Sequence, residues 1–254
     1  MAKKIKVSRK KIKQPDEFQT FTDRAFKYFN ENKQISYSVI GGAILALVLA
    51  SGISYTVKTR RAKADRLLIE AFSIINAPLA GQMTQASLLQ GGRNYSTGKE
   101  RAEEAIKKLT EVSDQFGSGE AGIEARFHLG EAYFEKGDYA GAIASYQDFL
   151  KHPGKNASVA EFLQDPAYLG LAKAYYGAGD FANAEQYFQK VIDAKLDAYL
   201  AEADLGLARV LIKKGEPDKA KEKLKLIMES YPGSIYDQLA KIELNNLSGA
   251  EAVK

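Results

Sequence analysis

The 254-residue chain contains no cysteine and no tryptophan, and it has only two histidines. The lack of cysteine excludes disulfide bonds, thiolate metal sites, cysteine nucleophiles and a lipid-modified N-terminal cysteine. Neither His128 nor His152 has a second histidine at the spacing of metal ligands. The glycine pairs of the chain lack the spacing and the strand context of a phosphate-binding loop. We therefore expect no enzymatic activity, no cofactor, no metal and no small-molecule substrate.

The excess of positive charge is confined to the beginning of the chain. Residues 1–34 hold 10 Lys and Arg against 4 Asp and Glu, a charge of +6, and the remainder holds 26 against 28, a charge of −2. A nucleic-acid-binding domain would carry its basic residues on the folded body, where they contact phosphates. The slightly acidic body therefore predicts that nucleic acid is not a partner.

An uncharged, apolar run extends over residues 35–57. At about 1.5 Å per residue, a helix of this length crosses a hydrocarbon core of roughly 30 Å. Tyr37 and Tyr55 lie near its two ends, where amphipathic rings favour the level of the lipid headgroups. A cleavable signal peptide, with Ala-Ser-Gly at 50–52 as its cleavage site, is the main alternative, but the run is longer than a signal core. The sequence predicts a single transmembrane helix.

Two charge patterns bear on the orientation of this helix, and they disagree. The nearest positive residues lie mostly after the span, in the stretch from Lys58 to Arg66. An inverted topology would, however, carry the whole basic tail across the membrane, and long following domains translocate largely regardless of charge. We favour a basic cytoplasmic tail at 1–34, a transmembrane helix at 35–57, and a domain at 58–254 outside the cytoplasm.

Two helical faces near the span are suited to contact with other molecules. Small residues at four-residue spacing on the span allow close packing of helices in lipid, although small residues are also common in spans generally. Before the span, residues 16–31 predict an amphipathic helix that contacts the membrane interface or a membrane partner. The small residues are Ser38, Gly42, Ala46, Ala50 and Ser54, and the apolar face of the earlier helix is formed by Phe18, Phe21, Ala25 and Phe29.

From Glu120 onward a two-helix unit occurs three times. Its leucines at 129, 171 and 207 are offset by 42 and 36 residues, against about 34 for a tetratricopeptide unit. A Gly-Asp or Gly-Glu pair predicts the reversal between the helices of each unit. We attribute the longer offset to an extended connection around Pro153. Helices at 58–76 and 99–116 form a degenerate first unit, and 234–247 predicts a capping helix.

The predicted fold class is thus all-α, with one N-terminal transmembrane helix followed by a tetratricopeptide-repeat α-solenoid. In such solenoids the first helix of each repeat lines the concave face. Positions counted from the small residue of each of these helices carry a mixture of apolar and charged side chains. These positions predict a mixed apolar groove that could hold an extended or helical protein segment. The alternative is that these side chains pack against the next repeat or against the 78–98 loop. The groove residues are Phe127, Glu131, Phe134, Leu169, Lys173, Tyr176, Leu205, Arg209 and Ile212.

The aromatic helix before the span, the glycine-rich span, the basic helix after it, the repeats and the final stretch KIELNNLSG at 241–249 resemble the YfgM-like proteins of bacterial inner membranes. The chain departs from that family in lacking tryptophan after the span and in its 78–98 loop. The resemblance implies an ancillary subunit of the SecYEG translocon with a periplasmic solenoid. Its expected partners are the Sec translocon, a membrane-anchored prolyl isomerase or client polypeptides of a chaperone network.

The leading hypothesis is therefore a membrane-anchored, protein-binding scaffold. A second hypothesis is an envelope assembly factor, resembling the solenoid proteins of Tol-Pal or outer-membrane assembly. A third is an inverted protein whose solenoid faces the cytoplasm as a recruitment adaptor.

Overall fold

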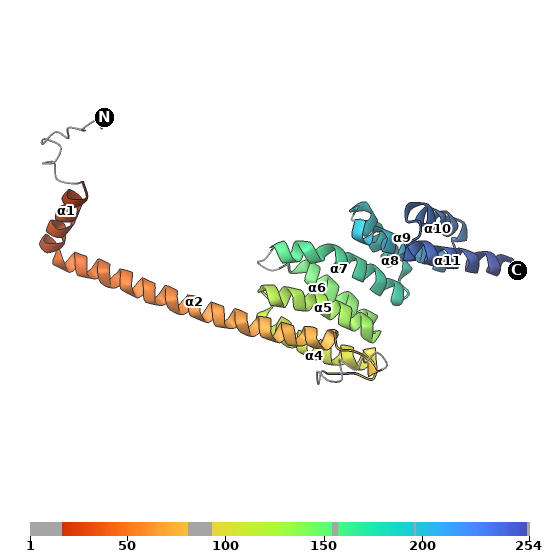
Figure 1. The fold of residues 1–254 in the computed structure, drawn as a ribbon, viewed down its shortest axis with the longest axis horizontal. Helices are drawn as coiled ribbons and strands as arrows, with labels where there is room; N and C mark the ends of the chain where they lie inside the picture. Colours follow the sequence, from red (N-terminus) through yellow and green to blue (C-terminus); the bar gives the residue numbers. More distant parts are fainter. Residues whose placement is uncertain (1–16, 81–92, 154–156, 196, 253–254) are drawn as a thin grey trace, which may run out of the picture. The chain divides into compact units, whose positions relative to one another are not determined.

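The computed structural model describes residues 17–80, 93–153, 157–195 and 197–252, so the first 16 residues of the basic tail and most of the 78–98 loop lie outside the described residues. The chain divides into two compact units, Met1–Arg60 and Arg61–Lys254. Helices make up both units, and the one β-contact in the described part is an isolated bridge between Leu79 and Tyr95 (Figure 1). The predicted all-α class, with a long apolar N-terminal helix followed by helical repeats, is confirmed.

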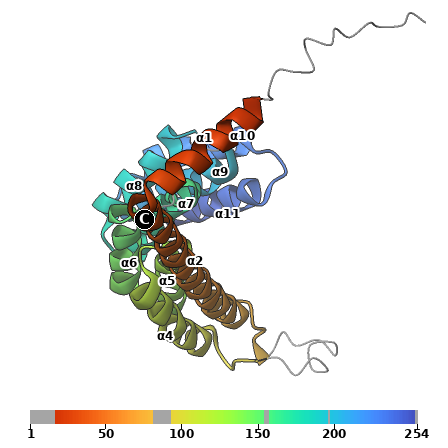
Figure 2. The same cartoon turned by 90° about the vertical axis from the view of Figure 1, so that its left-hand side faces the viewer.

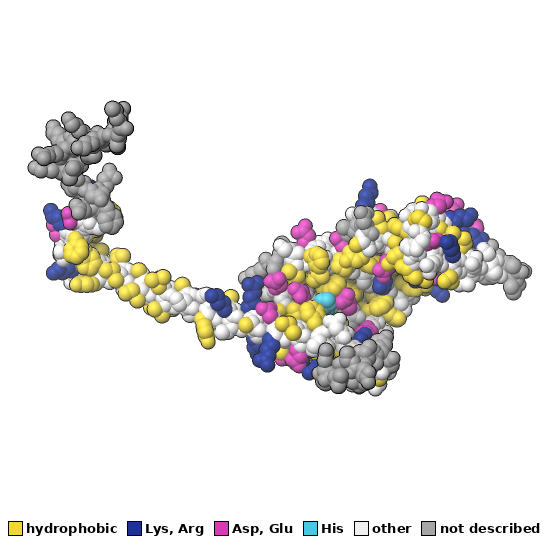
Figure 3. All heavy atoms as spheres, in the orientation of Figure 1, with side chains coloured by type: hydrophobic (Ala, Val, Ile, Leu, Met, Phe, Trp, Pro, Cys, Tyr) yellow, Lys and Arg dark blue, Asp and Glu magenta, His cyan; other side chains and the backbone are white. Residues whose placement is uncertain are grey.

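The first unit contains α1 (Glu17–Glu31) and the first part of α2 (Lys33–Ile75). Only Asn32 separates these helices. The most apolar stretch of α2 has no buried residue, and Figure 3 shows hydrophobic side chains along its surface. Of the described helices, α2 alone is long and apolar enough to cross a membrane, and near the N-terminus such a helix is typical of a membrane anchor or a signal sequence.

The second unit begins with the last part of α2, which packs against the helix after the loop. Leu68, Ala71 and Ile74 of α2 are buried together with Leu109 and Val112. Successive helix pairs then stack in chain order and follow an arc (Figures 1 and 2). The elements are α4 (Gly98–Phe116), α5 (Glu120–Lys136), α6 (Tyr139–Lys151), α7 (Ala157–Gly177), α8 (Phe181–Asp193), α9 (Asp197–Lys213), α10 (Pro217–Ser230) and α11 (Ile235–Ala252).

Glycine makes the turn between the two helices of each repeat, as the sequence predicts. Gly137, Gly179 and Gly215 have φ angles of 82°, 80° and 78°, the left-handed region that only glycine adopts without strain. The residue after each glycine donates its backbone N–H back into the preceding helix. Asp180 then caps α8, where hydrogen bonds from the side chain and backbone of Asn183 lower the pKa of its carboxyl.

The expected extended connection around Pro153 accounts for only part of the longer offset between the first two repeats. The connection from α6 to α7 is only two residues longer than the one from α8 to α9. The other four extra residues belong to α7, which has 21 residues against 17 in α9, and which contains Pro166 in its interior. A proline lacks the N–H that a helix interior uses, so sequence patterns predict a break where this helix continues.

In two of the repeats, an aromatic ring of the second helix packs against a glycine of the next repeat. Tyr146 of α6 lies against Gly170 of α7, and Phe188 of α8 lies against Gly206 of α9. A Cβ atom on Gly170 would lie 2.4 Å from Tyr146 Cζ, and one on Gly206 would lie 2.3 Å from Phe188 Cε1. Both rings are buried. The absence of a side chain at these two positions therefore sets how closely consecutive repeats approach.

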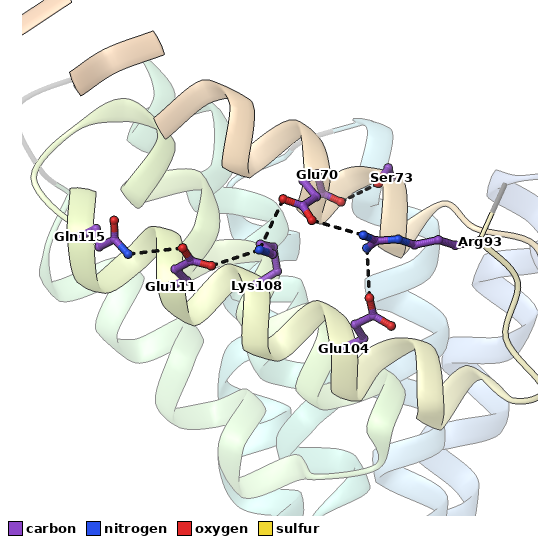
Figure 4. Close-up of polar contacts among 7 residues, drawn as sticks. All are labelled: Glu70, Ser73, Arg93, Glu104, Lys108, Glu111 and Gln115. Atoms are coloured by element: carbon purple, nitrogen blue, oxygen red, sulfur yellow. Dashed lines mark hydrogen bonds and ion pairs between the residues drawn. The ribbon is translucent and has the colours of Figure 1, made fainter. Parts of the chain in front are cut away.

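A network of ion pairs joins α2, α4 and the segment before α4 (Figure 4). Arg93 binds Glu70 at 3.2 Å and Glu104 at 3.0 Å. Lys108 binds Glu70 at 3.4 Å and Glu111 at 3.1 Å. The hydrogen bond from Lys108, followed by that from Arg93, lowers the pKa of Glu70. The far end of α2 is thus fixed to the first repeat by charged contacts as well as by the core.

A buried arginine joins the turn after α4 to the end of α6. Arg126 is 8% exposed and donates to the backbone carbonyls of Gly117, at 2.7 Å, and His152, at 2.6 Å. Its Nε lies 3.6 Å from a carboxylate oxygen of Asp148. Both carbonyls lie at chain reversals, where no helix supplies a donor, so this side chain satisfies two acceptors of the first full repeat.

Candidate functional site

A cavity of about 550 Å³ lies in the second unit between the first helices of successive repeats. Helices α5, α7, α9 and α11 supply most of its walls, and Tyr139 of α6 and Phe188 of α8 complete it. The sequence-predicted groove residues that line it are Phe134, Lys173, Tyr176, Leu205 and Arg209.

A second cavity of about 340 Å³ continues the first toward the N-terminal repeats. It shares Phe134 and Lys173 with the larger cavity. Glu131 and Leu169, also predicted from the sequence, are among its other lining residues. The two cavities together form one groove, which we call the α5–α11 groove.

The two remaining predicted residues line neither cavity. Phe127 is buried in the core, where its ring lies 5.8 Å from that of Tyr146 and 5.7 Å from that of Phe149. Ile212 is half-buried against the core between the second and third repeats. For Phe127 the structure therefore corrects the expected position, because packing between α5 and α6 occupies its side chain.

The sequence patterns did not identify the residues that α11 contributes to the groove. Ile235, Tyr236 and Leu239 of this helix line the larger cavity. A signal was present, because Leu239-Ala240-Lys241 repeats the pattern Leu207-Ala208-Arg209 of a groove-lining helix. The capping helix thus continues the series of first helices and closes one end of the groove.

Aromatic and aliphatic side chains dominate the larger cavity, and both of its cations are paired. Lys173 Nζ lies 2.9 Å from Glu202 Oε1, and Arg209 Nε lies 2.9 Å from Glu243 Oε1. The Lys173 ammonium also lies 5.7 Å from the centre of the Phe134 ring, within range of a cation–π contact. Burial, and then the negative charge of Glu202, raise the pKa of Tyr236. The groove thus combines apolar walls with charges that neutralise one another.

Each of the two histidines lies beside a carboxylate in the described part of the chain. His128 contacts the carboxylate of Glu131 at 2.6 Å, and His152 contacts that of Asp148 at 2.8 Å. No group of three His, Cys, Asp or Glu side chains suited to a metal occurs among the described residues. Burial is the main reason that the pKa of Glu124 is raised; nearby Glu120 and Asp65 add to this effect, and His128 opposes it.

The small residues of the predicted packing face lie on the exposed part of α2. A Cβ atom on Gly42 would meet no atom within 4 Å. Contact of this face with another helix stays a prediction. Its members are Ser38, Gly42, Ala46, Ala50 and Ser54.

Comparison with known protein families identifies helical repeats in the same part of the chain as the structure does. Two tetratricopeptide-repeat family models match the chain, one over residues 83–157 and one over residues 175–242. The chain is a tetratricopeptide-repeat protein. Such repeats are typically non-catalytic scaffolds that bind other proteins, so the α5–α11 groove lies in a protein-binding domain.

Solved structures of other tetratricopeptide-like repeats superimpose in part on this tetratricopeptide-repeat protein. A crystal structure of nearly identical TPR-like repeats from a kinesin light chain of Podosopora anserina has a TM-score of 0.49 at 16% identity, covering 61% of this chain and 81% of that one. A point variant of the same repeats gives the same score and identity, with 68% and 90% covered. No curated protein matches the sequence.

Proposed function

We propose that this tetratricopeptide-repeat protein is a membrane-anchored scaffold whose α5–α11 groove binds an apolar segment of a partner polypeptide. The observation that carries the proposal is the groove itself, in which α5, α7, α9 and α11 together present a largely apolar cavity. Cavities of about 300–1,000 Å³ with apolar walls and a few polar groups are typical of binding sites. Helices α7, α9 and α11 supply Tyr176, Leu205 and Leu239 as apolar contacts.

The paired charges in the groove narrow the class of ligand. Recognition of a chain-terminal carboxylate needs cations whose hydrogen bonds are available to it. Lys173 and Arg209 are instead bound to Glu202 and Glu243, so an incoming carboxylate would have to displace a carboxylate already in place. We therefore propose that the ligand is an internal apolar segment of an unfolded or helical polypeptide, bound without its terminus.

The domain boundaries and the membrane location are part of the same proposal. Residues 35–57 of α2 would cross the membrane between a cytoplasmic tail at 1–34 and a domain at 58–254 outside the cytoplasm. The exposed apolar surface of α2 supports a span. The resemblance to YfgM-like proteins supports a position beside the Sec translocon, where emerging polypeptides, or a membrane-anchored prolyl isomerase, would supply apolar segments.

The test is equilibrium binding of fluorescent peptides to the full-length protein in detergent micelles. The probe is a peptide rich in Leu and Phe, prepared with either an amidated or a free C-terminus. Tyr176→Arg puts a charge on the wall of the groove, and we expect it to weaken binding at least tenfold. Leu226→Arg is the matched control, because Leu226 is 49% exposed on α10 and lines neither cavity of the groove.

The two forms of the peptide separate the classes of ligand. The proposal predicts equal affinity for the amide and the free acid, with loss only in the groove variant. Tighter binding of the free acid would contradict the ligand class, and equal loss in both arginine variants would contradict the groove. Circular dichroism of each variant establishes that the helices are intact.

A further inference from the structure

The aromatic face of α1 is uncovered in the described part of the chain. Phe21 is 71% exposed, Phe26 73% and Tyr28 60%. At about 100° per residue, these three rings and Phe29 lie within an arc of about 160° on one side of the helix. The charged residues Asp23, Lys27 and Glu31 lie on the other side. A helix with this division is stable beside an apolar surface rather than free in water.

Contacts at the corner between α1 and α2 place this face next to the apolar run. The rings of Phe29 and Tyr37 meet edge to face, with centroids 5.7 Å apart. The side chain of Asn32 donates to the carbonyl of Tyr28 at 3.2 Å, and Ser36 is buried in the corner. Tyr37 lies where the apolar run of α2 begins, at the level where a bilayer changes from hydrocarbon to headgroups. Phe29, which contacts it, must lie at the same level.

We propose that α1 is an interfacial helix whose aromatic face lies among the lipid headgroups of the bilayer that α2 enters. The inference rests on the proposed membrane anchoring of α2. Lipid, rather than a second copy of the chain, is the occupant because the aromatic face is continuous with the apolar surface of α2. Seven Lys and Arg in residues 1–13 also precede α1, and such a basic segment is attracted to anionic headgroups.

The absence of tryptophan from the chain allows a direct test. F21W and D23W each introduce a sole tryptophan, two residues apart and therefore on opposite faces of α1. The full-length variants are reconstituted in vesicles of phosphatidylcholine with about one quarter phosphatidylglycerol, with and without brominated phosphatidylcholine as a quencher of neighbouring rings. L47W, at an exposed position in the middle of the apolar run, reports separately on the span.

The proposal predicts that brominated lipid quenches F21W, and that F21W is about threefold less accessible to acrylamide in water than D23W. Equal accessibility of F21W and D23W, with L47W quenched by lipid, would overturn the interfacial helix and leave the membrane anchor intact. Protection of F21W without quenching by brominated lipid would also overturn it, because protein would then cover the face. An L47W that brominated lipid does not quench would remove the anchor and the interfacial helix together.

Discussion

Substitution of Gly206 by alanine tests whether ring-to-glycine contacts hold consecutive repeats together. The new Cβ would lie 2.3 Å from Phe188 Cε1 and 2.4 Å from Phe188 Cζ. Carbon atoms normally approach to about 3.5–4.0 Å, so the ring has to move by more than about 1 Å. Phe188 is 2% exposed and packs against Val191 and Leu207 in the same core, so it has little space into which to move.

The magnitude follows from two opposing effects. Alanine favours the interior of a helix by about 1 kcal/mol over glycine. Overpacking of a well-filled core costs about 1–3 kcal/mol, and an overlap of this depth belongs at the upper end. We expect the Gly206→Ala variant to lose about 2 kcal/mol of unfolding free energy. For a domain of this size that corresponds to a fall in Tm of about 4–8 °C, measured by circular dichroism on the full-length protein in detergent.

Two further variants separate the clash from other effects of the substitution. Gly249→Ala in α11 is the control, since its Cβ would meet nothing within 4 Å, and we expect no loss of stability. Phe188→Leu removes the ring, and the buried Leu224 occupies the same position one repeat later. In the Phe188→Leu background, Gly206→Ala should cost at least about 1 kcal/mol less. A Gly206→Ala variant as stable as the natural chain, or an equal loss in both backgrounds, would refute the reasoning.

Three other predictions follow from charged groups of the repeats. Glu124→Gln should stabilise the fold at neutral pH, because the pKa of Glu124 is raised in the folded protein and its charged form therefore destabilises the fold. Below about pH 4, Glu124 is protonated in both the folded and the unfolded chain, so the difference in Tm between the variant and the natural chain should vanish. Arg126→Met removes the side-chain donor of the Gly117 and His152 carbonyls and should cost about 1–2 kcal/mol in urea unfolding, a loss that Arg126→Lys would recover only in part. Glu243→Gln frees Arg209 in the groove, and the free-acid peptide should then bind more tightly than the amide; equal affinities would show that Arg209 does not face the ligand.

Much of the fold could be predicted from the sequence because the features that specify it involve residues close together in the chain. An apolar run without charge specifies the exposed part of α2, and glycine at Gly137, Gly179 and Gly215 specifies the turns by its freedom at positive φ. The length of α7 could not be predicted in this way. Pro166 is a helix breaker by local rules, and the packing of Ala167 and Leu171 in the core outweighs that preference.

The site could be predicted less completely than the fold. Phe127, Leu169 and Leu205 are equivalent in the repeat pattern, yet only the two leucines line the groove. The difference arises because Phe127 is large enough to reach the rings of α6, a contact that depends on tertiary distances and not on spacing in the sequence. The pairing of Lys173 with Glu202 likewise joins residues of different repeats, so no local pattern reveals it.

Site-specific photocrosslinking in native membranes tests the central claim most directly. A photoreactive phenylalanine analogue replaces Tyr176 in the groove or, as the control, Leu226 on the exposed surface of α10. The account predicts a crosslinked polypeptide from position 176 and none from position 226, and it predicts that Phe134→Arg abolishes the adduct while leaving the protein in the membrane fraction. Equal adducts from both positions, or an adduct at position 176 that persists with Phe134→Arg in a folded protein, would contradict binding in the α5–α11 groove.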